Sequence, residues 1–179
     1  VVSGVPFLNE FTDKEKDNLG KYSSNLFTLN TFYSAIKRTI SGNKPNEEIQ
    51  IFLNNYWRCV TENMVQWGEL SRKEISKVDL RENYIVTQGV VIQALGQVGA
   101  YFCNNTEIDM DKMLSKLKNI NWKRSASIWK YRTIRADGKI LTSNKAILLT
   151  ANQIKREIGI PLLLDEEQKE KRYLESLSV

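Results

Sequence analysis

The side chains best suited to chemistry lie in one short segment, residues 122–139. Basic side chains are interleaved there with two tryptophans and a tyrosine. Lys and Arg pair with phosphates, while aromatic rings stack on bases and sugars, so this interleaving is typical of contact with nucleic acid. A solvated basic loop that covers buried tryptophans would give the same pattern, and the sequence leaves both interpretations open. The predicted nucleic-acid-binding residues are Trp122, Lys123, Arg124, Trp129, Lys130, Tyr131, Arg132, Arg135 and Lys139.

The distribution of charge favours a polyanion as the partner. Residues 110–156, which we call the basic block, hold 12 Lys or Arg and only 2 acidic residues. Residues 1–109 hold 11 basic and 13 acidic residues, and residues 157–179 hold 3 and 6. The whole excess behind the net charge of +5 therefore lies in one block, as expected of a protein that binds a polyanion.

Missing residue types exclude several kinds of active site. The chain has no His, which rules out His-based triads, His-ligated zinc and His general bases within it. Cys59 and Cys103 are too few for a thiolate zinc site and are not spaced as a redox pair, so we expect reduced core thiols in a cytoplasmic protein. No glycine-rich phosphate loop with a following Lys-Ser or Lys-Thr is present. We therefore predict no catalytic residue, no metal and no cofactor in this chain.

A central helix over about residues 79–103 is expected to organise the elements that position the basic segment. Asp79 can cap its start, with Glu82 as the capping-box partner. A neighbouring stripe contains Gly89, Gly96 and Ala100, and small side chains let other backbones approach closely. We expect tight packing on more than one side, with a ligand site on the glycine face as the alternative. One apolar face is formed by Leu80, Tyr84, Val91, Leu95, Val98 and Phe102.

Helical periodicity and capping signals predict a mainly α fold, a single-domain helical bundle over residues 1–179. The aromatic stripe of Phe52, Tyr56 and Trp57 is interpreted as core packing, with a stacking platform as the alternative. Asp137-Gly138 is a tight-turn dipeptide that predicts a small β-hairpin near 132–141. No apolar run approaches the roughly 20 residues of a membrane-spanning helix. Further helices are predicted over about 29–40, 46–64, 109–119, 145–158 and 166–177.

Several short motifs, taken together and in order, resemble one known family. The chain is similar to the carboxy-terminal half of DndB, of the DGQHR-domain proteins of the DNA phosphorothioation (sulfur modification) system. The resemblance covers nearly the whole chain, and its specificity comes from the collinearity of the motifs. The motifs that carry the resemblance are Leu26-Phe27-Thr28-Leu29, Tyr56-Trp57, residues 80–85, Gly89-Val90, Ala94-Leu95-Gly96, residues 120–125, Leu148-Leu149-Thr150-Ala151-Asn152, Ile154-Lys155 and Leu162.

The resemblance implies a bacterial DNA-binding transcriptional repressor of the sulfur-modification gene cluster. The signature Asp-Gly-Gln-His-Arg motif, to which nucleotide hydrolysis is attributed, belongs to the family's amino-terminal half and does not occur here. Gln88 stands where relatives tend to have His, so no catalytic residue is carried over. The chain does not begin with Met, and we expect it to be a piece of a longer protein.

Two functions remain open from the sequence. The first is a DNA-binding regulatory module, with the helix over 145–158 as the candidate for insertion into a groove. The second is a scaffold or dimerisation half of a nucleotide-hydrolysing protein, without DNA binding of its own. The partners to consider are double-stranded DNA, a second copy of the chain and the missing amino-terminal half.

Overall fold

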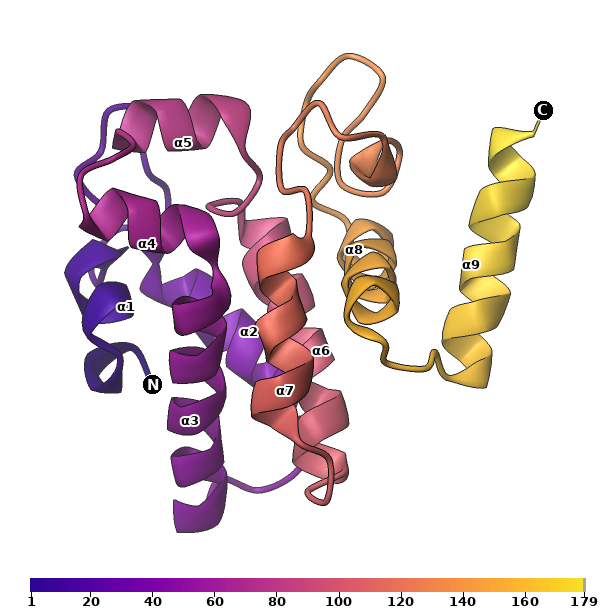
Figure 1. The fold of residues 1–179 in the computed structure, drawn as a ribbon, viewed down its shortest axis with the longest axis horizontal. Helices are drawn as coiled ribbons and strands as arrows, with labels where there is room; N and C mark the ends of the chain where they lie inside the picture. The colour runs from indigo at the N-terminus through magenta and orange to yellow at the C-terminus, as the bar shows by residue number, and fades with distance from the viewer. Residues whose placement is uncertain (179) are drawn as a thin grey trace.

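The computed structural model describes residues 1–178, and helices dominate it (Figure 1). This confirms the predicted mainly α fold. Strands β1 (Thr12–Asp13) and β2 (Phe27–Thr28) form a minimal parallel pair. Short 3-10 turns are η1 (Val2–Gly4), η2 (Ser115–Asn119) and η3 (Ser127–Trp129). The α-helices are α1 (Pro6–Phe11), α2 (Leu29–Ile40), α3 (Glu47–Asn63), α4 (Val65–Ser71), α5 (Lys77–Asn83), α6 (Gly89–Asn104), α7 (Met110–Leu114), α8 (Asn144–Ile158) and α9 (Leu164–Leu177).

Helix α6 is the centre of the packing, with α2 and α8 as its main neighbours. A methyl group added at Gly96 would lie 2.3 Å from the carbonyl oxygen of Ala35 in α2. At Gly99 it would lie 2.9 Å from the ring of Tyr56 in α3. The predicted close approach on more than one side is therefore confirmed, and the glycines serve helix packing.

The single helix predicted over 79–103 is wrong at its start, because the chain forms two helices there. Between α5 and α6 the backbone turns extended at Tyr84. The Ile85 amide donates to the Trp122 carbonyl over 3.1 Å, and the Arg124 amide donates to Asn83 over 2.9 Å. This pairing with a distant segment outweighs local helix preference. Ser76, rather than Asp79, caps α5.

Helices α2, α3, α8 and α9 begin and end close to their predicted positions, whereas the helix predicted over 109–119 is α-helical only to Leu114 and continues as η2. Side chains of Thr28, Asn46 and Ser143 accept the capping hydrogen bonds of α2, α3 and α8. Gly159 ends α8 in the left-handed region, at φ 84°, where glycine has no steric penalty. Within α3, Tyr56 and Trp57 are fully buried, which confirms the core interpretation of the aromatic stripe.

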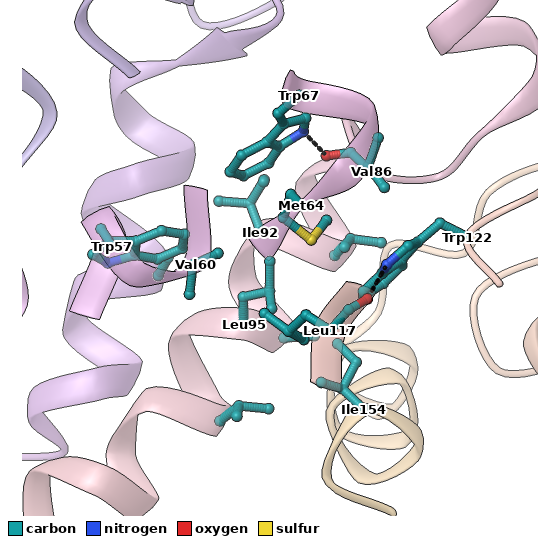
Figure 2. Packing of buried hydrophobic residues seen from close by; sticks show 14 of the residues in the cluster. Trp57, Val60, Met64, Trp67, Val86, Ile92, Leu95, Leu117, Trp122 and Ile154 are labelled. Atoms are coloured by element: carbon teal, nitrogen blue, oxygen red, sulfur yellow. Dashed lines mark hydrogen bonds between the residues drawn. The ribbon is translucent and has the colours of Figure 1, made fainter. Parts of the chain in front are cut away.

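The hydrophobic core joins α3, α4, α6 and α8 to the segment after α7 (Figure 2). Trp67 of α4 donates its indole N–H to the Val86 carbonyl over 3.3 Å. The Trp122 indole N–H donates to the Leu117 carbonyl over 3.2 Å. These two rings are thus buried with their polar atoms satisfied, whereas the buried Trp57 indole N–H has no hydrogen-bond partner within residues 1–178.

Candidate nucleic-acid interface

Two stacked tryptophans anchor the predicted contact segment from below. The rings of Trp122 and Trp129 lie 5.3 Å apart at an angle of 12°, and both are buried. The Trp129 indole donates to the Asn121 carbonyl over 2.6 Å, so both N–H groups are used inside the protein. The prediction that these two rings contact nucleic acid is corrected here: they support the loop, and their faces pack in the core.

The Asp137-Gly138 turn closes the outer part of the segment. Gly138 adopts φ 80°, and its amide donates to the Arg135 carbonyl over 3.0 Å. Leu141 donates to Thr133 over 2.8 Å, and Ile134 and Ile140 form an antiparallel bridge. The predicted hairpin exists as a tight turn with a single bridge, too short to form regular strands. At its base, the Thr133 and Thr150 hydroxyls lie 2.7 Å apart in the interior, which ties the turn to α8.

Four of the predicted cations are exposed in this segment: Lys123, Lys130, Arg135 and Lys139. Among residues 1–178, neither Lys123 nor Lys130 has a carboxylate within 4.0 Å. Arg135 and Lys139 lie 3.4 and 4.0 Å from Asp137, with side chains 58% and 77% exposed. Exposed pairs of this kind are worth little, so a phosphate can compete for both cations.

Tyr131 is the aromatic side chain that the segment leaves accessible. Its residue is 49% exposed, and its backbone lies at φ 60°, a region that a bulky side chain rarely adopts. The Tyr131 amide donates to Ile134 over 2.6 Å, and the preceding carbonyl, that of Lys130, accepts from the Tyr173 hydroxyl over 2.8 Å. These contacts hold an uncommon backbone conformation next to exposed cations, as often occurs at functional sites.

Two predicted contact residues have structural roles in this fold. Arg124 donates to the Arg81 carbonyl over 3.1 Å, and partial burial lowers the pKa of its guanidinium. Arg132 is buried and forms an ion pair with Glu170 of α9. The prediction that Arg132 lies on the accessible surface is therefore wrong for this structure, because a carboxylate from the end of the chain covers it.

Helix α8 does not present a free face for a DNA groove. Most of its residues are buried, including the whole run 149–155. It packs on α6 at one side and on α9 at the other (Figure 1). The prediction of α8 as a groove-reading helix is corrected on this ground, and the exposed loop is the stronger candidate for contact.

One family model matches most of the chain. The model for DndB, described as DNA-sulfur modification-associated, matches residues 1–161. The chain belongs to the DndB family. No curated protein and no solved structure matches the chain. Membership in the DndB family associates this chain with DNA sulfur modification, and the matched range contains the whole of segment 122–139.

Helix α9, which follows the range matched by the DndB model, was expected from the sequence, but its buried face was not. Glu166, Glu170 and Tyr173 are buried against α8 and the basic segment. These three residues are spaced at i, i+4 and i+7, which places them on one helical face. That spacing was the only sequence signal that this face is buried. A helical face with two acids and a tyrosine is ordinarily exposed to solvent, so the signal was not recognised.

Other parts of this DndB-family chain carry less chemistry. A cavity of about 460 Å³ lies between α2, α6 and the start of α9, with Lys37, Arg38, Tyr101, Lys155 and Glu166 in its lining. Lys155 and Glu166 bind each other there, which leaves a mixed lining without one preferred ligand. Within residues 1–178, no group of three or more His, Cys, Asp or Glu side chains could hold a metal ion. None of the described helices is both long and apolar enough to span a membrane.

Burial accounts for the two thiols. Cys59 is buried, and burial, together with Asp111 and Glu62, raises its pKa to about 12. Cys103 is partly buried, and burial also raises its pKa. A thiol with a raised pKa is a poor nucleophile, so neither residue is a candidate for chemistry at neutral pH.

Proposed function

We propose that this chain is a DNA-binding regulatory module of the sulfur-modification system, acting as a repressor of that gene cluster. The observation that carries the proposal is the group of exposed side chains Lys123, Lys130, Tyr131, Arg135 and Lys139. They belong to a segment that the buried, stacked rings of Trp122 and Trp129 fix to the core. We call these five residues the contact surface. Membership in a family associated with DNA sulfur modification supports a DNA ligand for it.

The cations of the contact surface would pair with phosphates along a duplex. Each pairing releases condensed counterions, so affinity falls with salt by a log–log slope of roughly −0.9 for each phosphate contacted. The turn beneath Arg135 and Lys139 is closed by backbone hydrogen bonds, which reduces the entropy lost on binding. Tyr131 adds a ring that can pack on sugar or an unstacked base.

Contacts of this kind position a protein on DNA without reading its sequence. Repression would follow from occupancy of a promoter, with sequence preference supplied by DNA shape. The module would therefore contribute affinity and orientation more than discrimination between sites.

The test is fluorescence anisotropy of a labelled duplex with the triple variant Lys130→Ala/Arg135→Ala/Lys139→Ala. We expect the affinity to fall by more than tenfold at low salt and the salt slope to flatten by roughly 2 to 3. Thermal stability should not change, since exposed substitutions usually alter it by no more than about 0.5 kcal/mol.

A matched control removes three other exposed lysines, in Lys14→Ala/Lys16→Ala/Lys44→Ala. It makes the same change in net charge, but in the region that carries no positive excess. Equal losses in the two variants would reduce the effect to net charge and contradict the assignment of the contact surface. Absence of binding by the wild-type chain would favour the scaffold or dimerisation role instead.

A further inference from the structure

Helix α9 places carboxylates on three cations of the basic block. Glu170 forms ion pairs with Arg132, from the loop, and with Arg156 of α8 at 2.9 Å. Glu166 receives both hydrogen bonds from the Lys155 ammonium, at 2.6 and 2.8 Å. Arg132, Lys155 and both carboxylates are almost fully buried in these pairs. Three of the block's cations are therefore paired within the chain, against the two negative charges of Glu166 and Glu170.

The attachment of α9 depends mainly on these polar contacts. Tyr173 is its only buried apolar side chain within the described helix, and the Arg132 guanidinium lies 4.4 Å from the centre of the Tyr173 ring. Leu164, Leu174 and Leu177 remain 73%, 46% and 45% exposed. α9 lies at the edge of the molecule, beyond α8 (Figure 1). Little apolar area would have to be exposed if α9 moved away.

The carboxylates occupy positions that suit phosphate oxygens. Two guanidinium groups from separate elements converge on Glu170, and paired arginines of this kind also recognise phosphate. Asn152 adds an amide N–H to Glu170 at 3.2 Å, while its own buried side-chain oxygen has no hydrogen-bond partner. The two guanidinium groups and the Asn152 amide N–H thus surround an anion, a role that Glu170 fills in this fold, while the unpaired Asn152 oxygen is an acceptor and adds nothing to anion binding.

This face is continuous with the contact surface. The Tyr173 hydroxyl of α9 donates to the carbonyl of Lys130, and Arg132 follows Tyr131 directly in the chain. A polyanion bound at Lys130 and Tyr131 would therefore lie next to the pairs that α9 forms. Five acidic and three basic side chains give α9 the net negative charge of a competitor for phosphate.

We propose that the face formed by Arg132, Lys155 and Arg156 is a second polyanion-binding surface, which α9 masks and which DNA phosphates can claim by displacing Glu166 and Glu170. The inference rests on the proposed DNA-binding function and deepens it. DNA would first engage the contact surface and then compete with α9 for the buried Arg132 and Lys155 and for Arg156, whose paired side chain is 43% exposed. Full engagement would add roughly 0.9 to the salt slope for each cation gained.

The first test uses the full chain with Glu166→Gln/Glu170→Gln, which removes both charges and keeps the side-chain shapes. The matched control is Glu167→Gln/Glu175→Gln, which makes the same charge change at exposed positions of the same helix. In duplex anisotropy across a salt series, the first variant is expected to bind more than tenfold tighter than the control, with a steeper slope. Equal affinities and slopes in the two variants would overturn the inference and leave the proposed function standing.

The second test uses only the wild-type chain, so it does not depend on how well a variant folds. Hydrogen exchange of amides 164–177 is measured with and without a saturating duplex, and with inorganic polyphosphate as a second probe. We expect either polyanion to accelerate exchange in α9. Unchanged or slower exchange in α9 with the duplex bound would overturn the masking role. Failure of the wild-type chain and both variants to bind duplex would overturn the proposed function and this inference together.

Discussion

Helices α6 and α9 both pack against α8, but they are held by opposite kinds of contact. α6 is almost entirely apolar along its buried length, and it approaches α2 so closely that Gly96 has no room for a methyl group. α9 is attached through Glu166, Glu170 and one tyrosine, with its leucines exposed. Apolar packing is not screened by salt and does not titrate, whereas ion pairs weaken with ionic strength, with protonation of the carboxylate and with competing anions. One side of α8 is therefore a permanent core, and the other is a contact that solution conditions can change.

Trp122→Ala should have the largest effect on the permanent side. It removes a buried ring that stacks on Trp129 and fills the space beside Leu117, at an expected cost of about 3–5 kcal/mol. Urea unfolding should show a lower midpoint, while Trp122→Phe should recover part of the loss because it keeps a ring. A cost below about 1 kcal/mol would mean that the segment does not depend on the core.

Gly96→Ala tests the closest helix contact. Alanine is favoured over glycine within a helix by roughly 1 kcal/mol, but its methyl group would meet the Ala35 backbone at 2.3 Å. We expect a net loss of about 1–3 kcal/mol in the free energy of unfolding. Gly20→Ala is the control, because a methyl group there meets nothing within 4 Å. If Gly96→Ala were stabilising, the two helices would not approach as closely as described.

The attachment of α9 should show a smaller, local effect that depends on pH. Burial acts to raise the pKa of Glu170, but hydrogen bonds and charge from Arg132, with Asn152 and Arg156, outweigh it and hold the pKa below its ordinary value. A carboxyl with a lowered pKa stabilises the folded state above its unfolded pKa, about 4.3, and loses that contribution as pH falls through the folded value.

Protection of amides 164–177, corrected for intrinsic exchange, should therefore fall at acidic pH while protection in α6 persists. Glu170→Gln should reduce protection in α9 already at neutral pH and remove most of its pH dependence. Parallel loss of protection in α6 and α9 would show that the two helices open together, and the contrast between them would fail.

Sequence patterns were informative where stability comes from local and apolar signals. The apolar periodicity of α2, α3 and α8 was sufficient to place these helices, and their N-terminal caps agree with those positions. The mainly α fold and the position of the basic segment followed from the same kind of signal.

Contacts between distant segments could not be read in this way. The break before α6 depends on backbone pairing of residues 83–85 with 122–124, which no local pattern encodes. Burial of Arg132 depends on a carboxylate supplied by Glu170, and a charged residue in an irregular segment is ordinarily solvated. The basic segment could thus be recognised from the sequence as a candidate site, whereas the division between its supporting and accessible residues required the structure.

The most direct test of the account is the salt dependence of duplex binding by the wild-type chain. If the four exposed cations of the contact surface each pair with a phosphate, the log–log slope should be roughly −3 to −4, and steeper if α9 is displaced. A flat salt dependence, or no binding at low salt, would contradict the assignment of DNA contact to this part of the protein.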